Sequence, residues 1–248
     1  MVSSSILIAV TIDIKSLTVK DSLNDDVWTA DRKLKPEIRK HLLTIAENFY
    51  EELDIPWAEL EDVKFTGSLA NYNWSKYSDI DLHLIVDYTL VDENEDFVEA
   101  YFNARKNLWN SSHDISIHGF DVEVYVEDNE AIHYASGMYS VMNDDWIVEP
   151  EPTKPAIDKE AITQKSKVIM RLTDDLVLDK MREENYDGAI QSAEALSDKL
   201  KKMRQCGLES GGEFSVENLT YKVLRRNGTL EKLWNVKIEA YDALMTID

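Results

Sequence analysis

The stretch 65–86 constrains the fold of this chain more than any other. It contains a Gly-Ser turn at Gly67 and Ser68 and continues, after a short connecting segment, into an apolar strand that carries Asp79 and Asp81. Side chains at positions i and i+2 of a strand point to the same face. The two carboxylates therefore project together, while the apolar residues between and after them face the other way. The stretch predicts a sheet with one apolar face and one acidic face.

The acidic face has the residue types of a metal and phosphate site. Two carboxylates side by side repel one another unless a cation lies between them. A Gly-Ser turn just before them offers backbone N–H groups and a hydroxyl to a phosphate. Phosphate together with a divalent metal is the chemistry of nucleoside triphosphates. We therefore expect Asp79 and Asp81 to bind metal, and Gly67 and Ser68 to hold the phosphates.

A third carboxylate is expected on a later strand. In the segment 119–126 the acids Asp121 and Glu123 alternate with apolar residues, so both share one face. Glu123 lies between valines, as a residue in the middle of a sheet would. Glu123 is the preferred third ligand for this reason, and Asp121 stays open as the alternative.

Taken together, these residues resemble the nucleotidyltransferase superfamily of DNA polymerase β. The resemblance covers roughly residues 35–126, and the compact layout is also similar to that of small transferases carried by tailed phages. It implies an α+β fold, in which a mixed sheet forms the palm-like catalytic domain and a helical bundle follows. It also implies two Mg²⁺ or Mn²⁺ ions held by Asp79, Asp81 and Glu123. The implied reaction moves a nucleoside monophosphate from a nucleoside triphosphate to an acceptor hydroxyl and releases pyrophosphate.

Hydrophobic periodicity predicts the elements of the first part of the chain. A helix over 36–53 begins at a proline, which suits a first helical turn. A second helix is predicted over 94–109, with Phe97, Tyr101, Ala104 and Leu108 on one face. Strands are predicted over 5–14, 63–66, 79–86 and 115–126, and short further strands over 139–142 and 146–148.

A proline cluster marks the predicted domain boundary. Three of the five prolines, Pro150, Pro152 and Pro155, lie within six residues, and proline continues neither a helix interior nor a strand ladder. We therefore expect a catalytic domain over 1–150 and a helical domain over 151–248. Helices are predicted over 158–184, 187–205, 215–226 and 229–246, with a glycine-rich loop over 206–212.

Composition limits the partners and the compartment. The net charge of −21 argues against an extended nucleic-acid surface, because binding many phosphates needs clustered Lys and Arg. Cys206 is the only cysteine, so an intramolecular disulfide is excluded and a zinc site is disfavoured. No apolar run approaches the length of a transmembrane helix. These features predict a cytoplasmic protein that does not bind membranes.

Basic residues are few, and two groups of them cluster. Lys222, Arg225 and Arg226 have the spacing i, i+3 and i+4, which places three positive charges on one helix face. They are predicted to contact the nucleotide phosphates, and the adjacent Tyr221 is placed to stack on a base. The alternative is an ordinary solvated face. A second cluster consists of Lys199, Lys201, Lys202 and Arg204.

Two functions are consistent with these patterns. The first is the metal-dependent nucleotidyltransferase, whose acceptor is a small molecule, a protein side chain or an RNA end. The alternative is a non-catalytic module of the same fold that senses nucleotides or binds a partner. All the carboxylates that catalysis needs are present in Asp79, Asp81 and Glu123, which favours the enzyme.

Overall fold

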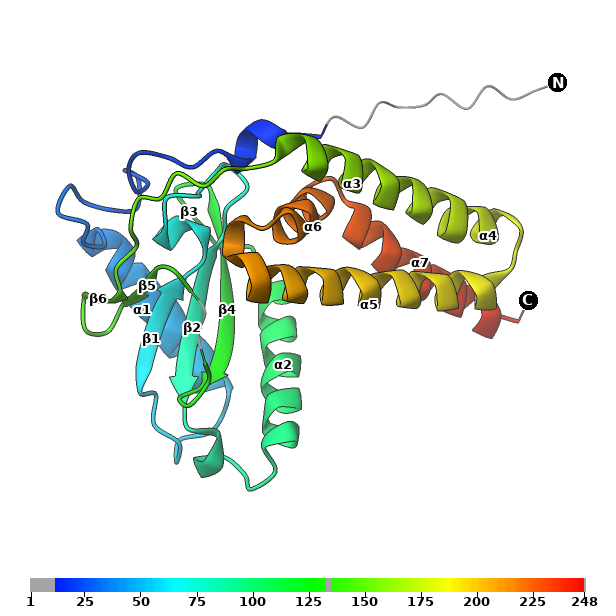
Figure 1. The fold of residues 1–248 in the computed structure, drawn as a ribbon. Coiled ribbons are helices and arrows are strands. Elements are labelled where there is room, and N and C mark those ends of the chain that lie inside the picture. The colour runs from blue at the N-terminus through cyan, green and yellow to red at the C-terminus, as the bar shows by residue number, and fades with distance from the viewer. Residues whose placement is uncertain (1–11, 133–134, 248) are drawn as a thin grey trace. The chain divides into compact units, whose positions relative to one another are not determined.

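The computed structural model describes residues 12–132 and 135–247, and Figure 1 draws it as a ribbon. The chain divides into two compact units, which are described separately below. One unit is Thr18–Lys154, and the other consists of the described residues on either side of it. The division after Lys154 lies within the proline-rich segment, just beyond the boundary predicted at 150. Residues 12–17 belong with the later helices.

A six-stranded mixed sheet forms the centre of the first unit. Its strand order is β3-β4-β2-β1-β5-β6, and only β2 and β4 pair in parallel. The α+β class with a mixed sheet is therefore confirmed. The strands are β1 (Asp62–Thr66), β2 (Ile80–Val86), β3 (Ser116–Ile117), β4 (Phe120–Asp128), β5 (Met138–Ser140) and β6 (Asp145–Val148).

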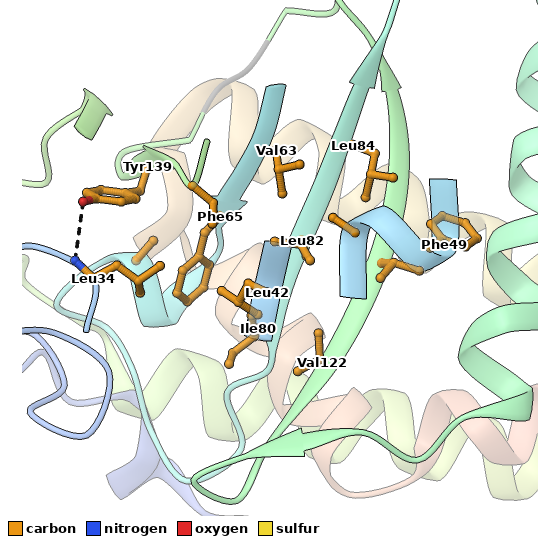
Figure 2. Packing of buried hydrophobic residues seen from close by; sticks show 14 of the residues in the cluster. Leu34, Leu42, Phe49, Val63, Phe65, Ile80, Leu82, Leu84, Val122 and Tyr139 are labelled. Atoms are coloured by element: carbon orange, nitrogen blue, oxygen red, sulfur yellow. Dashed lines mark hydrogen bonds between the residues drawn. The ribbon is translucent and has the colours of Figure 1, made fainter. Parts of the chain in front are cut away.

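One face of the sheet is apolar and packs against α1 (Pro36–Glu52), which confirms the helix predicted over 36–53. Leu82 and Leu42 are fully buried, as is Phe65 of β1. Figure 2 shows these three side chains lying together at the centre of the core. Burying one such side chain contributes roughly 1.5–3 kcal/mol. These apolar contacts hold one face of β2 against the core. The residues that alternate with the buried ones therefore lie on the opposite face of the sheet.

The helix predicted over 94–109 is present as α2 (Glu95–Ser112), but of the apolar face formed by Phe97, Tyr101, Ala104 and Leu108 only Tyr101 packs against the core. Phe97 and Leu108 are 62% and 56% exposed, whereas the buried residues are Val98, Phe102 and Trp109. The first set is spaced by three and four residues and the buried set by four and seven, and each spacing keeps residues on one helix face, so the apolar pattern alone does not choose between them. The buried set is selected by aromatic packing, since the Trp109 ring lies 5.3 Å from that of Phe49.

The strand predicted over 115–126 is interrupted. His118 and Gly119 have φ values of 52° and 82°, and they connect β3 to β4 as an antiparallel hairpin. Positive φ at both central residues is typical of a two-residue type I′ turn. The prediction of one continuous strand is therefore wrong at this turn, although the later part, Phe120–Asp128, forms β4 as expected.

The helical unit contains most of the predicted helices. Its elements are η1 (Ile14–Leu17), α3 (Lys159–Thr173), a π-helical turn (Asp174–Leu178), α4 (Asp179–Arg182), α5 (Tyr186–Gly211), η5 (Gly212–Phe214), α6 (Val216–Arg226) and α7 (Thr229–Met245). Ser215 caps α6 as expected by accepting a hydrogen bond from the Asn218 N–H. Leu17 packs with Ile162, Leu219 and Val223, which ties residues 12–17 to α3 and α6.

Two predictions near these helices need correction. The loop predicted over 206–212 is mostly helix, because α5 continues to Gly211. Gly207 is buried, and a Cβ there would lie 2.5 Å from Glu217 Cβ, so this glycine permits close helix packing and does not mark a loop. The strand predicted over 5–14 falls mainly outside the described residues, and Ile14 begins a 3-10 turn.

None of the helices in the described part of the chain combines the length and the apolar character needed to cross a membrane.

Asn110 joins α2 to the open edge of β4. Its Nδ2 donates to the Val124 carbonyl and its Oδ1 accepts from the Val124 N–H, each at 3.1 Å. The short β3 pairs only with Phe120 and Asp121, so it does not reach this position. The Asn110 side chain therefore takes the place of a neighbouring strand for one residue of β4.

We expect Asn110→Ala to lower the free energy of unfolding by about 1–3 kcal/mol, because it leaves the buried N–H and C=O of Val124 without partners. Asn107→Ala is a matched control, since Asn107 is exposed on the same helix. Urea unfolding of the two variants measures the difference. Equal stabilities would show that water replaces the Asn110 hydrogen bonds.

Candidate functional site

The parallel pairing of β2 and β4 brings three carboxylates together. Asp81 lies directly opposite Glu123 in the strand register, and Asp79 lies just before β2 begins at Ile80. One ligand oxygen from each of the three carboxylates lies within 4.8 Å of the other two, and all three residues are half-buried. This is the face of the sheet opposite the apolar core.

Asp121 is not part of this group, although it shares a face with Glu123. It is exposed and lies opposite Ser116 of β3 in the hairpin. Of the two candidates for the third carboxylate, Glu123 is therefore the one that lies with Asp79 and Asp81.

Gly67 follows β1 and passes directly beside Asp81. Its φ of 82° and ψ of −167° lie in a region that only glycine adopts readily. A Cβ built at this position would lie 1.9 Å from Asp81 Oδ2. Glycine is therefore needed at this position for two reasons: the backbone conformation and the close approach of the turn to the carboxylate.

Ser68 is tied to the residue that precedes Asp79. Its Oγ lies 2.7 Å from the Ser78 Oγ, which also accepts a hydrogen bond from the Ser75 N–H at 2.9 Å. These contacts hold the Gly-Ser turn close to the start of β2. Ser78 was not singled out in the sequence, although its place next to Asp79 was visible there.

Tyr125 is a further residue of the site that the sequence pattern did not single out. Its Oη donates a hydrogen bond to Glu123 Oε2, and its ring stacks on His83 at a centroid distance of 4.9 Å. Burial, followed by the negative charge of Asp81 and the hydrogen bond to Glu123, raises the pKa of Tyr125 above its ordinary value. The phenol therefore stays protonated and acts as a donor to Glu123. Its position two residues after Glu123, on the same face, was the available signal.

His83 extends the same row of side chains, since it lies two residues after Asp81 on β2. Its Nδ1 lies 3.0 Å from Glu127 Oε2. The strand register places His83 opposite Tyr125. These two pairs continue the column that begins with Asp81 and Glu123, so the polar face of the sheet is one connected network.

A cavity of about 400 Å³ lies between α2 and β4, and Tyr125 is one of its lining residues. Lys106 places its ammonium 5.2 Å from the Tyr125 ring centroid. The other charged lining residues are all acidic: Glu95, Asp96, Glu99, Glu127 and Asp128. Such a lining repels an anion such as a triphosphate.

The predicted basic contacts lie in the helical unit, on α6. Arg225 is exposed, and Arg226 donates from Nη1 to the Ser16 Oγ at 2.7 Å. The pKa of the half-buried Lys222 is lowered, first by burial and then by Arg226, Arg204 and Arg225, while Glu213 acts in the opposite direction. Arg226 therefore has a structural contact as well, and the role of all three residues in nucleotide binding stays a prediction.

Comparison with known proteins adds no relative, because no family model, curated protein or solved structure matches the chain.

Gly67→Ala is expected to destabilise the sheet unit by about 1–3 kcal/mol more than Gly119→Ala. Both glycines have a φ of 82°, but a Cβ at Gly119 meets nothing within 4 Å, whereas one at Gly67 collides with Asp81. Gly119→Ala therefore measures the strain of an uncrowded turn glycine, and the difference combines the crowding against Asp81 with the stricter backbone requirement at Gly67, whose ψ is −167°. Guanidinium unfolding of both variants gives the two values. Equal losses would contradict the close contact.

Tyr125→Phe is expected to make stability less sensitive to alkaline pH. Because the pKa of Tyr125 is raised in the folded state, the folded protein holds the phenol proton more tightly than the unfolded chain does. This contribution is complete below about pH 10, the ordinary tyrosine pKa, and is lost as the pH rises above it. Urea unfolding at about pH 8 and about pH 11 should show a smaller loss in the variant. An equal loss in both proteins would rule out the raised pKa.

Proposed function

We propose that this chain is a metal-dependent nucleotidyltransferase. It moves a nucleoside monophosphate from a nucleoside triphosphate to an acceptor hydroxyl and releases pyrophosphate. The observation that supports this proposal best is the group of Asp79, Asp81 and Glu123, with the Gly67 turn packed against Asp81. The palm-like role of the sheet unit belongs to the same proposal.

The three carboxylates suit Mg²⁺ or Mn²⁺. Their oxygens lie within 4.8 Å of one another on neighbouring strands, and oxygen is the ligand that these hard cations prefer. Negative charges held this closely repel one another, so divalent cations relieve the repulsion. Gly67 keeps the space beside Asp81 free of a side chain. We assign Asp79, Asp81 and Glu123 as the ligands of two ions.

The chain's own residues then have distinct tasks. The carboxylates of Asp79, Asp81 and Glu123 hold the cations and face the reacting groups. Tyr125 fixes one oxygen of Glu123, which leaves the other oxygen for binding. Gly67 and Ser68 offer the turn's N–H groups and hydroxyl to the terminal phosphates. When bound, the divalent ions neutralise phosphate charge and lower the pKa of the attacking hydroxyl.

The basic face of α6 is the proposed phosphate contact of the helical unit. Burial is the first cause of the lowered pKa of Lys222; Arg226, Arg204 and Arg225 lower it further, and Glu213 acts against them. This local excess of positive charge favours an anion, in a chain whose net charge is −21. Lys222, Arg225 and Arg226 are therefore kept as proposed nucleotide contacts.

The proposal predicts transfer of label from a nucleoside triphosphate to an acceptor in the presence of Mg²⁺ or Mn²⁺. Each of the four labelled triphosphates is incubated with RNA, protein and metabolite fractions of a cell extract. Asp79→Asn, Asp81→Asn and Glu123→Gln should each reduce transfer by on the order of 10²–10³-fold, because each removes a metal ligand.

Asp121→Asn is the matched control, since Asp121 lies on the same strand and face but outside the group. Its transfer rate should stay within about twofold of the parent, less than half a kcal/mol in barrier height. Transfer that survives Asp79→Asn and Asp81→Asn would overturn the metal role. Binding of ATP without any transfer would favour the nucleotide-sensing module.

A further inference from the structure

The helical unit contains a cavity of its own, about 490 Å³ in volume, between α5, α6 and α7. This volume falls within the range of roughly 300–1,000 Å³ that is usual for small-molecule sites. Leu200 forms part of the wall and is buried. The lining residues are Glu194, Ser197, Asp198, Leu200, Lys201, Tyr221, Leu230, Trp234 and Lys237.

Helical spacing explains why these residues line one space. Glu194, Asp198 and Lys201 follow each other at i, i+4 and i+7 along one face of α5. Trp234 and Lys237 lie three residues apart on α7. The two faces meet because α5 and α7 pack extensively against one another. The charged and aromatic side chains therefore converge on the cavity from two helices.

The cavity has two aromatic walls, and each ring lies close to a cation. Trp234 is 63% exposed, and the Lys237 ammonium lies 5.8 Å from its ring centroid. The guanidinium of Arg204 lies 4.9 Å from the centroid of Tyr221. An exposed tryptophan at the mouth of a cavity offers a large flat surface to a ligand. Planar rings such as nucleobases stack well on such surfaces.

The cavity lining also contains side chains of both charges. Lys237 pairs with Glu194 at 3.3 Å, and the exposed Lys201 lies across the cavity on α5. Lysine ammonium groups bind phosphate. The exposed Asp198 is an acceptor for the ring and amino N–H groups of a base. An uncharged aliphatic ligand would use neither the lysines nor the carboxylate.

We propose that this cavity binds a nucleotide, with its base stacked on Trp234 and its phosphate close to Lys201. The nucleotide is either free or the end of a single strand, and both sources present the same base and phosphate. The lining residues of the cavity belong to the helical unit, whereas the proposed metal ligands Asp79, Asp81 and Glu123 belong to the sheet unit. The proposed nucleotide site needs no metal and goes beyond the proposed transfer reaction.

The test uses the full chain in EDTA, which suppresses binding that depends on divalent ions. Adenosine, guanosine, cytidine and uridine monophosphates and a short single-stranded RNA are titrated while the tryptophan indole N–H signals are followed by NMR. With six tryptophans in the chain, the missing signal in Trp234→Phe assigns Trp234. We expect the Trp234 signal to shift and the Trp57 signal to stay.

Trp57→Ala is the matched control, because Trp57 is 62% exposed and lies in the sheet unit. Trp234→Ala should weaken binding roughly 5–150-fold, the range for loss of one stacked base. Trp234→Phe should retain part of the affinity. Lys201→Gln should weaken binding and reduce its salt dependence. Circular dichroism confirms that each variant is folded.

The outcomes distinguish a free nucleotide from a strand end as the ligand, and binding at this cavity from binding at the proposed metal site. Tighter binding of the RNA than of the mononucleotides identifies a strand end as the ligand, and equal binding identifies a free nucleotide. Absence of binding in the parent, or equal binding in Trp234→Ala and Trp57→Ala, would overturn this proposal. Asp79→Asn should leave binding in EDTA unchanged, so a failure of the transfer reaction is recognised independently.

Discussion

The parallel pairing of β2 with β4 is the contact on which the rest of the sheet unit depends. It places Leu82 and Val124 in the buried core and, on the opposite face, sets Asp81 against Glu123. The apolar face supplies the free energy that holds two carboxylates side by side against their repulsion. A shift of one residue in this register would bury the acids, so the core and the site specify each other.

Gly67 lies beside this strand pair, at the proposed phosphate site. The turn passes so close to Asp81 that no side chain fits between them, and the Ser68–Ser78 contact ties it to the start of β2. On the other side, Tyr125 holds Glu123 and stacks on His83. The carboxylates are thus supported from both sides by residues of the same unit, which limits their freedom to move apart.

The alternation of acidic and apolar residues was enough to predict β2, the later part of β4 and the shared face of Asp79, Asp81 and Glu123. It favoured Glu123 because of the flanking valines but left Asp121 open, since both satisfy the same period; in the structure Asp121 lies opposite Ser116 in the β3 hairpin. The buried face of α2 was missed for a similar reason, since two apolar stripes compete on that helix. Gly207 was read as a loop signal because its partner, Glu217, lies in another helix. Such contacts between distant residues leave no local pattern.

The helical unit is assembled from both ends of the chain, since residues 12–17 pack with α3 and α6. The whole sheet unit is therefore an insertion between the first and the later parts of the helical unit. Because synthesis proceeds from the N-terminus, Ser16, Leu17 and the whole sheet unit are made before α6, which carries the packing partners of Ser16 and Leu17. Packing of Leu17 against α6 therefore closes a loop that contains the whole sheet unit, and a truncated chain ending near Lys154 would leave this short N-terminal segment without its packing partners.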